Sequence, residues 1–336
     1  MEISEKNNIL ISILICSWQA PSVLDETLLS VSGQEGLNAC EVLLVNNGFS
    51  ETRANDLLNK FSFLKIIQEP TPGLTHARRA AFRVAEGDFF LCIDDDNFLK
   101  SGFLKSLIDF VTRHPSLGCV CPVVVPRWES EPPLWVQNFG VRCLSYTAPH
   151  EPGASPAEKV WRHPDTQGWP WPPGGGMIIH RRIAEDYLSS SDKKRLAFDR
   201  VGKGLGGCGD QDIYLRYKNL NFDVGYSEKL VLYHHIPDSR TKYAYLFKVI
   251  FRTTQDWAVL QRLWRREGHP CATDQFELHF REFFRLPYAW MRIFLRTQKS
   301  IPEMPLEWAH HAGFLLGWYR DAFWDFINNQ LGTQKS

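Results

Sequence analysis

Residues 87–96 read Gly-Asp-Phe-Phe-Leu-Cys-Ile-Asp-Asp-Asp. The apolar run at 89–93 predicts a parallel strand that is covered on both faces. Asp94, Asp95 and Asp96 follow it directly. Each pair of like charges at ~4 Å costs about 4 kcal/mol at an effective dielectric near 20, so solvent or a cation must offset the repulsion. Alternate residues of an extended segment point the same way, so we expect Asp94 and Asp96 to share one divalent ion and Asp95 to face elsewhere; the alternative is a solvated acidic turn.

Short apolar runs and helical segments continue to alternate on both sides of this strand. Further strands are predicted over residues 9–16, 41–45, 63–67 and 119–125, and helices over residues 21–32, 52–61, 74–85 and 101–113. This alternation predicts right-handed βαβ units and therefore an α/β fold with a doubly wound, mostly parallel, Rossmann-like sheet. Ligands bind at the carboxyl ends of such strands, so we expect Ser17, Asn46 and Asn47 to share one rim with the three carboxylates.

The later part of the chain is less regular. Residues 126–175 are rich in Pro, Trp and Gly, which is typical of an irregular insertion or of a segment that covers a substrate. Short strands are predicted over 177–179 and 231–235 and a helix over 210–218, and the Gly-rich residues 202–209 are either a mobile loop or a plain connector. From residue 241 the chain is helical, with aromatic and arginine residues interleaved. These helices either lie on an anionic membrane surface or pack on the core or on a second subunit.

Composition excludes several classes of protein. The 336 residues are 44% hydrophobic and 23% charged, which is typical of a globular chain. The net charge of zero gives no field that favours nucleic acid. Eight scattered cysteines form no pair of CxxC motifs, so we expect reduced thiols rather than a zinc site or disulfides. The acidic start is unlike a signal peptide and no run reaches the ~20 apolar residues of a membrane span, so we expect a cytoplasmic protein that is at most peripheral at the inner face of the cell membrane.

Seven segments together resemble the family 2 glycosyltransferases of the GT-A fold. They are ILICSW (13–18) with the turn that ends at Gln34, EVLLVNNG (41–48), GLTHAR (73–78), GDFFLCIDDD (87–96), GGGM (174–177), GDQDI (209–213) with Arg216, and VLYHH (231–235). Each motif is weak alone, but their order and spacing over about residues 8–240 are specific. We expect a catalytic domain over 1–240, with a nucleotide-sugar half to about 125 and an acceptor half over 126–240, and a helical extension over 241–336.

The resemblance implies roles for the residues at matching positions. The donor-binding set is Ser17, Asn46, Asn47, Arg78, Asp94 and Asp95. Mg²⁺ or Mn²⁺ is assigned to Asp94, Asp96 and His234, with His235 as the alternative to His234. Asp210 is the catalytic base, with Asp212 as second choice. The acceptor-binding set is Trp171, Gly175, Gly176 and Asp212, and the alternative for Trp171 and for the neighbouring Trp169 is packing.

These residue types match the chemistry of sugar transfer. A cation stabilises the charge on the leaving nucleotide diphosphate, and a base takes the proton of the acceptor hydroxyl. One base without an internal nucleophile predicts inversion at the anomeric carbon. The resemblance to the family implies a glycan or lipid-linked glycan of the cell envelope as acceptor. Asn46 stands where the family usually has Asp, and Gly209 where it often has Glu. Two alternatives therefore stay open: a non-catalytic subunit that binds a nucleotide sugar or a glycan, and a sugar nucleotidyltransferase, which would need a Gly-rich basic loop after the first strand.

Overall fold

A computed structural model describes residues 10–140, 143–147, 158–162, 172–190, 204–269, 276–297 and 304–332. The chain divides into two compact units. The first unit consists of Met1–Glu129, Leu144–Gly202 and Gly209–Ile236, and the second of Ser130–Cys143, Lys203–Cys208 and Pro237–Ser336. Trp169 and Trp171 lie outside the described residues, so their predicted roles stay predictions.

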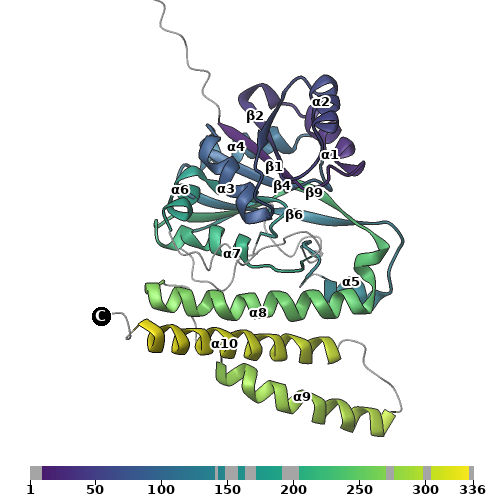
Figure 1. Cartoon of the computed structure of the whole chain (residues 1–336). Helices are drawn as coiled ribbons and strands as arrows, with labels where there is room; N and C mark the ends of the chain where they lie inside the picture. The colour runs from purple at the N-terminus through teal and green to yellow at the C-terminus, as the bar shows by residue number, and fades with distance from the viewer. Residues whose placement is uncertain are drawn as a thin grey trace, which may run out of the picture. The chain divides into compact units, whose positions relative to one another are not determined.

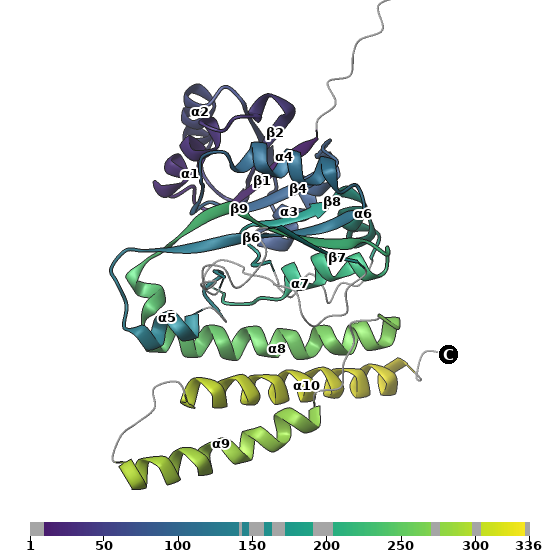
Figure 2. The same cartoon turned by 180° about the vertical axis from the view of Figure 1, so that it is seen from behind.

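The first unit is built on one β-sheet (Figures 1 and 2). Its N-terminal strands are β1 (Ile11–Ser17), β2 (Cys40–Asn46), β3 (Leu64–Gln68) and β4 (Phe89–Asp94). They lie in the order β3-β2-β1-β4, and every neighbouring pair is parallel. Ile13, Leu44 and Leu91 at the centres of three strands are fully buried. The predicted parallel sheet is thus confirmed in this half of the unit.

The other half of the sheet is mixed. It contains β5 (Asn97–Leu99), β6 (Leu117–Trp128), β7 (Glu158–Trp161), β8 (Met177–His180) and β9 (Asp223–Ile236). The order continues β4-β8-β6-β9-β5, with β7 also beside β9. β6 and β9 are parallel, whereas β8, β5 and β7 are antiparallel to their neighbours. With the helices described next, this confirms the predicted α/β class.

Strand β9 is much longer than the predicted 231–235. The strand bulges in its middle, because Cys121 pairs with Tyr226 but Val123 pairs with Val231. Polar residues occupy the bulge and interrupt the apolar pattern, which hid the first half of the strand from sequence reasoning. β5 was also missed, since three residues are too few for a periodicity.

Helices cover the sheet of the first unit. They are α1 (Val23–Ser32), α2 (Glu51–Lys60), α3 (Leu74–Val84), α4 (Phe103–Arg113), α6 (Arg181–Ser189) and α7 (Gly209–Tyr214), which continues as a 3-10 turn to Lys218. α4 illustrates the cause: Phe103, Leu107 and Phe110 recur at helical spacing and are fully buried. Four of these helices confirm the predictions over 21–113 to within two residues at each end, whereas α6 was not predicted.

The second unit is helical, as predicted. Its helices are α5 (Leu134–Gly140), α8 (Tyr243–Glu267), α9 (Phe276–Thr297) and α10 (Met304–Gly332). α10 packs against α8 and α9 and lies between them in both views (Figures 1 and 2). A Cβ at Gly313 or Gly317 of α10 would overlap the backbone carbonyl oxygen of Phe251 or Gln255 of α8. Only glycine therefore permits this close contact between the two helices.

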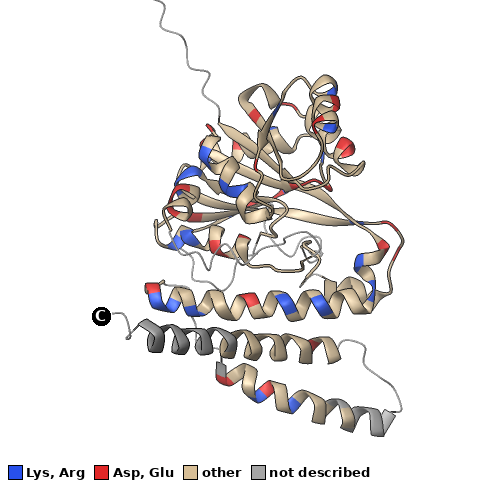
Figure 3. Ribbon diagram, viewed as in Figure 1, with Lys and Arg blue, Asp and Glu red and all other residues tan. Residues whose placement is uncertain are grey.

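Helix α9 combines exposed apolar and charged side chains. Phe280, Phe284 and Tyr288 are 46%, 62% and 58% exposed, and their four-residue spacing aligns them in one stripe. Figure 3 shows basic and acidic residues interspersed on this helix, where Arg281 and Arg285 both pair with Glu282. Of the helices in the described segments, none combines the length and the apolar character that crossing a bilayer requires.

Candidate active site at the carboxyl edge of the sheet

The carboxyl ends of β1, β2 and β4 meet at one edge of the sheet, as predicted. In the register of the strands, Ser17 lies opposite Asn46 and Cys16 lies opposite Asp94. The polar residues that follow three separate strands are therefore neighbours in space. The structure then directs the three consecutive carboxylates to three different partners.

Asp94 faces a pair of glycines. A Cβ at Gly175 would lie 2.6 Å from Asp94 Oδ2 and 2.7 Å from Asn97 Oδ1. The Asp94 N–H donates to Asn97 Oδ1 over 2.8 Å, which holds the chain in a tight turn after β4. The carboxylate of Asp94 thus lies against the backbone of the segment that precedes β8, and only glycine leaves room for it.

Arg78 joins Asp94 to Asp210. The Arg78 guanidinium is buried, and its Nη2 donates to the carbonyl oxygen of Gly174 over 3.2 Å. A Cβ at Gly174 would lie 2.8 Å from Asp210 Oδ2 and 3.2 Å from Arg78 Nη2. Burial alone would lower the pKa of Arg78, but the neighbouring Asp94, Cys92 and Asp210 together outweigh it, so the pKa is raised. A buried cation that interacts electrostatically with two carboxylates is the centre of the candidate site.

Asp210 belongs to the first turn of α7. Its Oδ1 accepts a hydrogen bond from the N–H of Gln211 over 3.0 Å, while Oδ2 points toward Gly174. The next carboxylate, Asp212, is only 1% exposed, and its Oδ1 lies 3.6 Å from Arg216 Nη2. Arg216 Nη1 also pairs with Asp186 Oδ2 at 2.8 Å. The structure therefore places Asp210, and not Asp212, beside Arg78.

Asp95 turns toward β1. Ser17 Oγ donates to Asp95 Oδ2 over 2.5 Å and accepts from the N–H of Ala20 over 3.0 Å. Thr27 of α1 donates to the carbonyl oxygen of Asp95 over 3.0 Å. This agrees with the prediction that Asp95 faces away from Asp94 and Asp96.

Asn46 and Asn47 are both engaged with the backbone. Asn46 Oδ1 accepts from the N–H groups of Gly48 and Phe49, and its Nδ2 donates to the carbonyl oxygen of Phe49. Asn47 Nδ2 donates to the carbonyl oxygens of Glu69 and Thr71, and its Oδ1 accepts from Gly73 N–H. An aspartate at position 46 could not donate to Phe49, so the amide fits this turn better than the residue that is usual in the family. These side chains hold the rim loops in place.

Asp96 lies beside His234. β5 pairs with β9 so that Asn97 lies opposite His234, and the N–H of His235 donates to the carbonyl oxygen of Asp96 over 2.9 Å. Asp96 Oδ1 and His234 Nε2 are 3.5 Å apart, and both residues are buried. His234 rather than His235 therefore faces the carboxylates.

The separation of these two atoms suits a shared cation. It is close to the roughly 3.0–3.4 Å between two ligands that are each bound at ~2.1 Å to one divalent ion. Asp94 does not join them. In the part of the chain that the structure describes, the only group of three ligand atoms within 4.8 Å of one another is a histidine cluster in the second unit. The structure thus brings together two of the three predicted metal ligands.

Two residues of this edge were missed from the sequence. Asn97 directly follows the carboxylates, but only the turn that joins β4 to β5 shows that its side chain reaches back to Asp94. Gly174 was noted in the motif at 174–177, yet only Gly175 and Gly176 were given a role. Gly176 itself has a φ of +119° and donates its N–H to the carbonyl oxygen of Cys92, so it ends the turn before β8.

Comparison with known proteins gives one family match and several weaker similarities. The model of "Glycosyl transferase family 2" matches residues 12–188. A cholesterol galactosyltransferase of Borreliella burgdorferi is 27% identical over 100 residues, which are 29% of this chain and 28% of that protein. The chain therefore aligns with under a third of that relative's length.

Solved structures of S. aureus TarS are similar over most of the chain. TarS 1-349 is 15% identical with a TM-score of 0.46, over 93% of this chain and 92% of that one. TarS 1-349 in complex with UDP is 14% identical with a TM-score of 0.44, over 93% and 92% of the two chains.

Proposed function

The chain belongs to glycosyl transferase family 2, and on that premise we propose that this glycosyltransferase moves a sugar from a nucleotide-diphosphate donor to a hydroxyl group of a glycan or lipid-linked glycan. The observation that supports the proposal most directly is the convergence of Arg78, Asp94 and Asp210 around Gly174 and Gly175. Four separate segments of the chain supply this set. A buried cation next to two carboxylates suits a reaction in which charge moves between a phosphate and an acceptor oxygen.

The donor lies at the carboxyl edge of β1, β2 and β4. We assign it the predicted residues Ser17, Asn46, Asn47, Arg78, Asp94 and Asp95. Because Asn46 and Asn47 bond to the backbone, their part is to shape the rim, whereas Arg78 supplies positive charge near the diphosphate.

A divalent cation, Mg²⁺ or Mn²⁺, is assigned to Asp96 and His234; the sequence predicted Asp94 as a third ligand, but its carboxylate lies against Gly175 instead. The 3.5 Å separation of Asp96 Oδ1 and His234 Nε2 fits a shared ion. When bound, the ion would stabilise negative charge on the leaving diphosphate. The buried positions of the two residues orient them without help from solvent.

Asp210 is the proposed base. In the transfer, the acceptor oxygen forms a bond to the anomeric carbon, the bond from that carbon to the diphosphate oxygen breaks, and the hydroxyl proton passes to Asp210. A single direct displacement inverts the anomeric carbon. Gly174 lies against Asp210 Oδ2, and we assign the next two residues, Gly175 and Gly176, to the acceptor side as the sequence predicted. Asp212 pairs with Arg216, so we assign it the positioning of α7 rather than contact with the acceptor.

We also propose that residues 1–240 form the catalytic domain and that the helices of residues 241–336 bring it to a membrane surface on which a lipid-linked acceptor lies. The exposed stripe of Phe280, Phe284 and Tyr288, with Arg281 and Arg285 on the same helix, supports this. Aromatic side chains insert at the headgroup level and arginines attract anionic lipid.

The first experiment is a thermal-shift screen against UDP-, GDP-, CMP- and dTDP-sugars with and without Mn²⁺. A donor at a hundred times its dissociation constant should add about 2.7 kcal/mol to the free energy of unfolding. A shift with one nucleotide that needs Mn²⁺ and disappears in Asp96→Ala supports the donor and metal assignments. The absence of any shift in folded protein would contradict the donor assignment. Nuclear magnetic resonance of the product then reports inversion or retention.

A further inference from the structure

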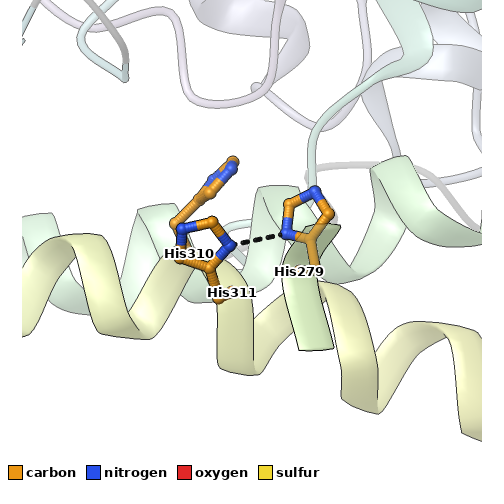
Figure 4. A group of neighbouring side chains, drawn as sticks. All are labelled: His279, His310 and His311. Atoms are coloured by element: carbon orange, nitrogen blue, oxygen red, sulfur yellow. Dashed lines mark hydrogen bonds between the residues drawn. The ribbon is translucent and has the colours of Figure 1, made fainter. Parts of the chain in front are cut away.

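Three imidazoles converge in the second unit, far in sequence from the proposed active-site residues. His279 comes from α9, and His310 and His311 come from α10 (Figure 4). One ligand nitrogen from each lies within 4.8 Å of the other two. The three ring centroids are 4.8 to 5.1 Å apart, so the rings surround a common point.

Two of these rings are held in place by their surroundings. His279 is 3% exposed and stacks on Phe314, with 3.8 Å between the ring centroids and an interplanar angle of 5°. His310 Nδ1 lies 3.0 Å from Thr254 Oγ1, and that hydroxyl also lies 2.7 Å from the carbonyl oxygen of Ile250. A side chain that is already fixed loses little freedom when it binds an ion.

The hydrogen bonds of Thr254 define the tautomer of His310. The single hydroxyl hydrogen of Thr254 goes to the Ile250 carbonyl oxygen, so Thr254 accepts from Nδ1–H of His310. The lone pair of His310 is then on Nε2. Metal-binding histidines commonly donate their second ring N–H to a protein oxygen in this way, which orients the ring and fixes the ligand nitrogen.

His279 and His311 already contact each other through ligand atoms. Their Nδ1 atoms are 2.9 Å apart, and one hydrogen lies between the two nitrogens. Two nitrogens bound at ~2.05 Å to a tetrahedral Zn²⁺ lie roughly 3.3 Å apart, so an ion could replace that hydrogen after a movement of a few tenths of an ångström.

We propose that His279, His310 and His311 bind one Zn²⁺ ion that joins α9 to α10. Three neutral nitrogens suit zinc or a related transition metal, whereas Mg²⁺ and Mn²⁺ prefer oxygen ligands. A fourth ligand would be left to solvent.

The test is a Zn²⁺ titration of the full-length, tag-free apoprotein against a chromophoric chelator. We expect one tight site per chain and a rise in melting temperature when Zn²⁺ is added. His279→Phe keeps an aromatic ring on Phe314 and removes the nitrogen, and His310→Gln keeps a hydrogen-bond partner for Thr254. Each should weaken Zn²⁺ binding at least about 100-fold while the circular dichroism spectrum stays helical.

Two controls separate this site from other zinc-binding groups. His114→Gln removes a partly buried histidine that contacts Phe110 in the first unit, and it should leave Zn²⁺ affinity unchanged. Asp96→Asn should also leave it unchanged, since the proposed site does not include the carboxylates. Unaltered Zn²⁺ affinity in folded His279→Phe, or loss of the tight site in Asp96→Asn, would overturn the proposal. Cobalt substitution gives a second readout: the visible absorption of a tetrahedral Co²⁺ site should appear in the wild-type protein and be absent from His279→Phe.

Discussion

Three carboxylates that are consecutive in sequence and three histidines that come from two separate helices behave in opposite ways in this molecule. Asp94, Asp95 and Asp96 are consecutive, yet their side chains face Gly175, Ser17 and His234 respectively. His279 lies a long segment before His310 and His311, yet the three rings surround one point. A run of like residues at the end of a strand and in the turn that follows it is spread over different directions, whereas helix packing brings distant residues together.

The comparison teaches that sequence adjacency is a poor guide to shared chemistry. The carboxylate that lies with Asp94 around Arg78 is Asp210, which comes from a different helix much later in the chain. If the three consecutive carboxylates have separate partners, replacing each should give a different phenotype. If the three histidines bind one ion, replacing any of them should give the same phenotype.

The largest expected effect tests whether Asp210 is the distant partner of the carboxylate run. Asp210→Asn should reduce turnover by about 10²–10⁴-fold, because the amide cannot take up the proton of the acceptor hydroxyl. Binding of the donor should persist, which a thermal shift measures. Asp56→Asn on α2 replaces an exposed carboxylate and should keep full activity. Normal turnover in Asp210→Asn would mean that another group is the base.

The next effect separates Asp96 from Asp95. Asp96→Asn should reduce activity by about 10²–10³-fold at low Mn²⁺ and raise the Mn²⁺ concentration needed for half activation, since it removes a charged ligand. Asp95→Asn weakens the bond to Ser17 and should change the KM for the donor instead. Steady-state kinetics over a range of Mn²⁺ concentrations checks both. Identical metal dependence in the two variants would contradict separate roles for neighbouring carboxylates.

A smaller effect tests the contact of Asp94 with the glycine segment. Gly175→Ala places a methyl group where Asp94 Oδ2 and Asn97 Oδ1 already lie, and it should reduce kcat/KM by up to ~10²-fold through misplacement of Asp94. Gly33→Ala is the matched control, because its nearest neighbour is 3.8 Å away. Equal activity of the two alanine variants would show that Asp94 does not need its present position.

The smallest effect concerns a histidine outside the cluster. His180 Nδ1 accepts from the N–H of Arg182 and caps α6, and burial lowers its pKa below the ordinary value of 6.5. The cap therefore contributes stability above pH 6.5 that is lost as the pH falls through the lowered folded-state pKa. Asparagine does not titrate, so His180→Asn can cap α6 at every pH. The free energy of unfolding of this variant should therefore change less with pH than that of the wild type, by under about 1 kcal/mol. Chemical denaturation at several pH values measures this, with His114→Asn as a control that should keep the wild-type dependence.

Much of the first unit was predictable, because its signals are local. β1, β2 and β4 are nearly continuous apolar runs, and the helices that follow have buried stripes at their own period. The edge where β1, β2 and β4 end followed from parallel topology alone. The convergence of Arg78 and Asp210 on Gly174 did not, since no local pattern reports which segments meet.

The histidine cluster was not predictable for the same reason. His279 and His310-His311 lie on separate helices, and their spacing matches no metal-binding motif within one element. Their meeting depends on the rotation of α9 and α10 about their own axes, which side-chain packing decides. Phe314 fixes part of it, because its ring lies flat on that of His279.

At Gly313 and Gly317, the backbone of α10 contacts the backbone of α8 directly, so we expect the two helices to move together. Backbone rests directly on backbone at Phe251 and Gln255, with no side chain between them that could change rotamer and absorb a displacement. A displacement of α10 is therefore expected to be transmitted to α8 through these backbone contacts. His310 and His311 lie within one turn of Gly313. An ion bound to them would therefore act on a part of α10 whose backbone contacts α8 directly.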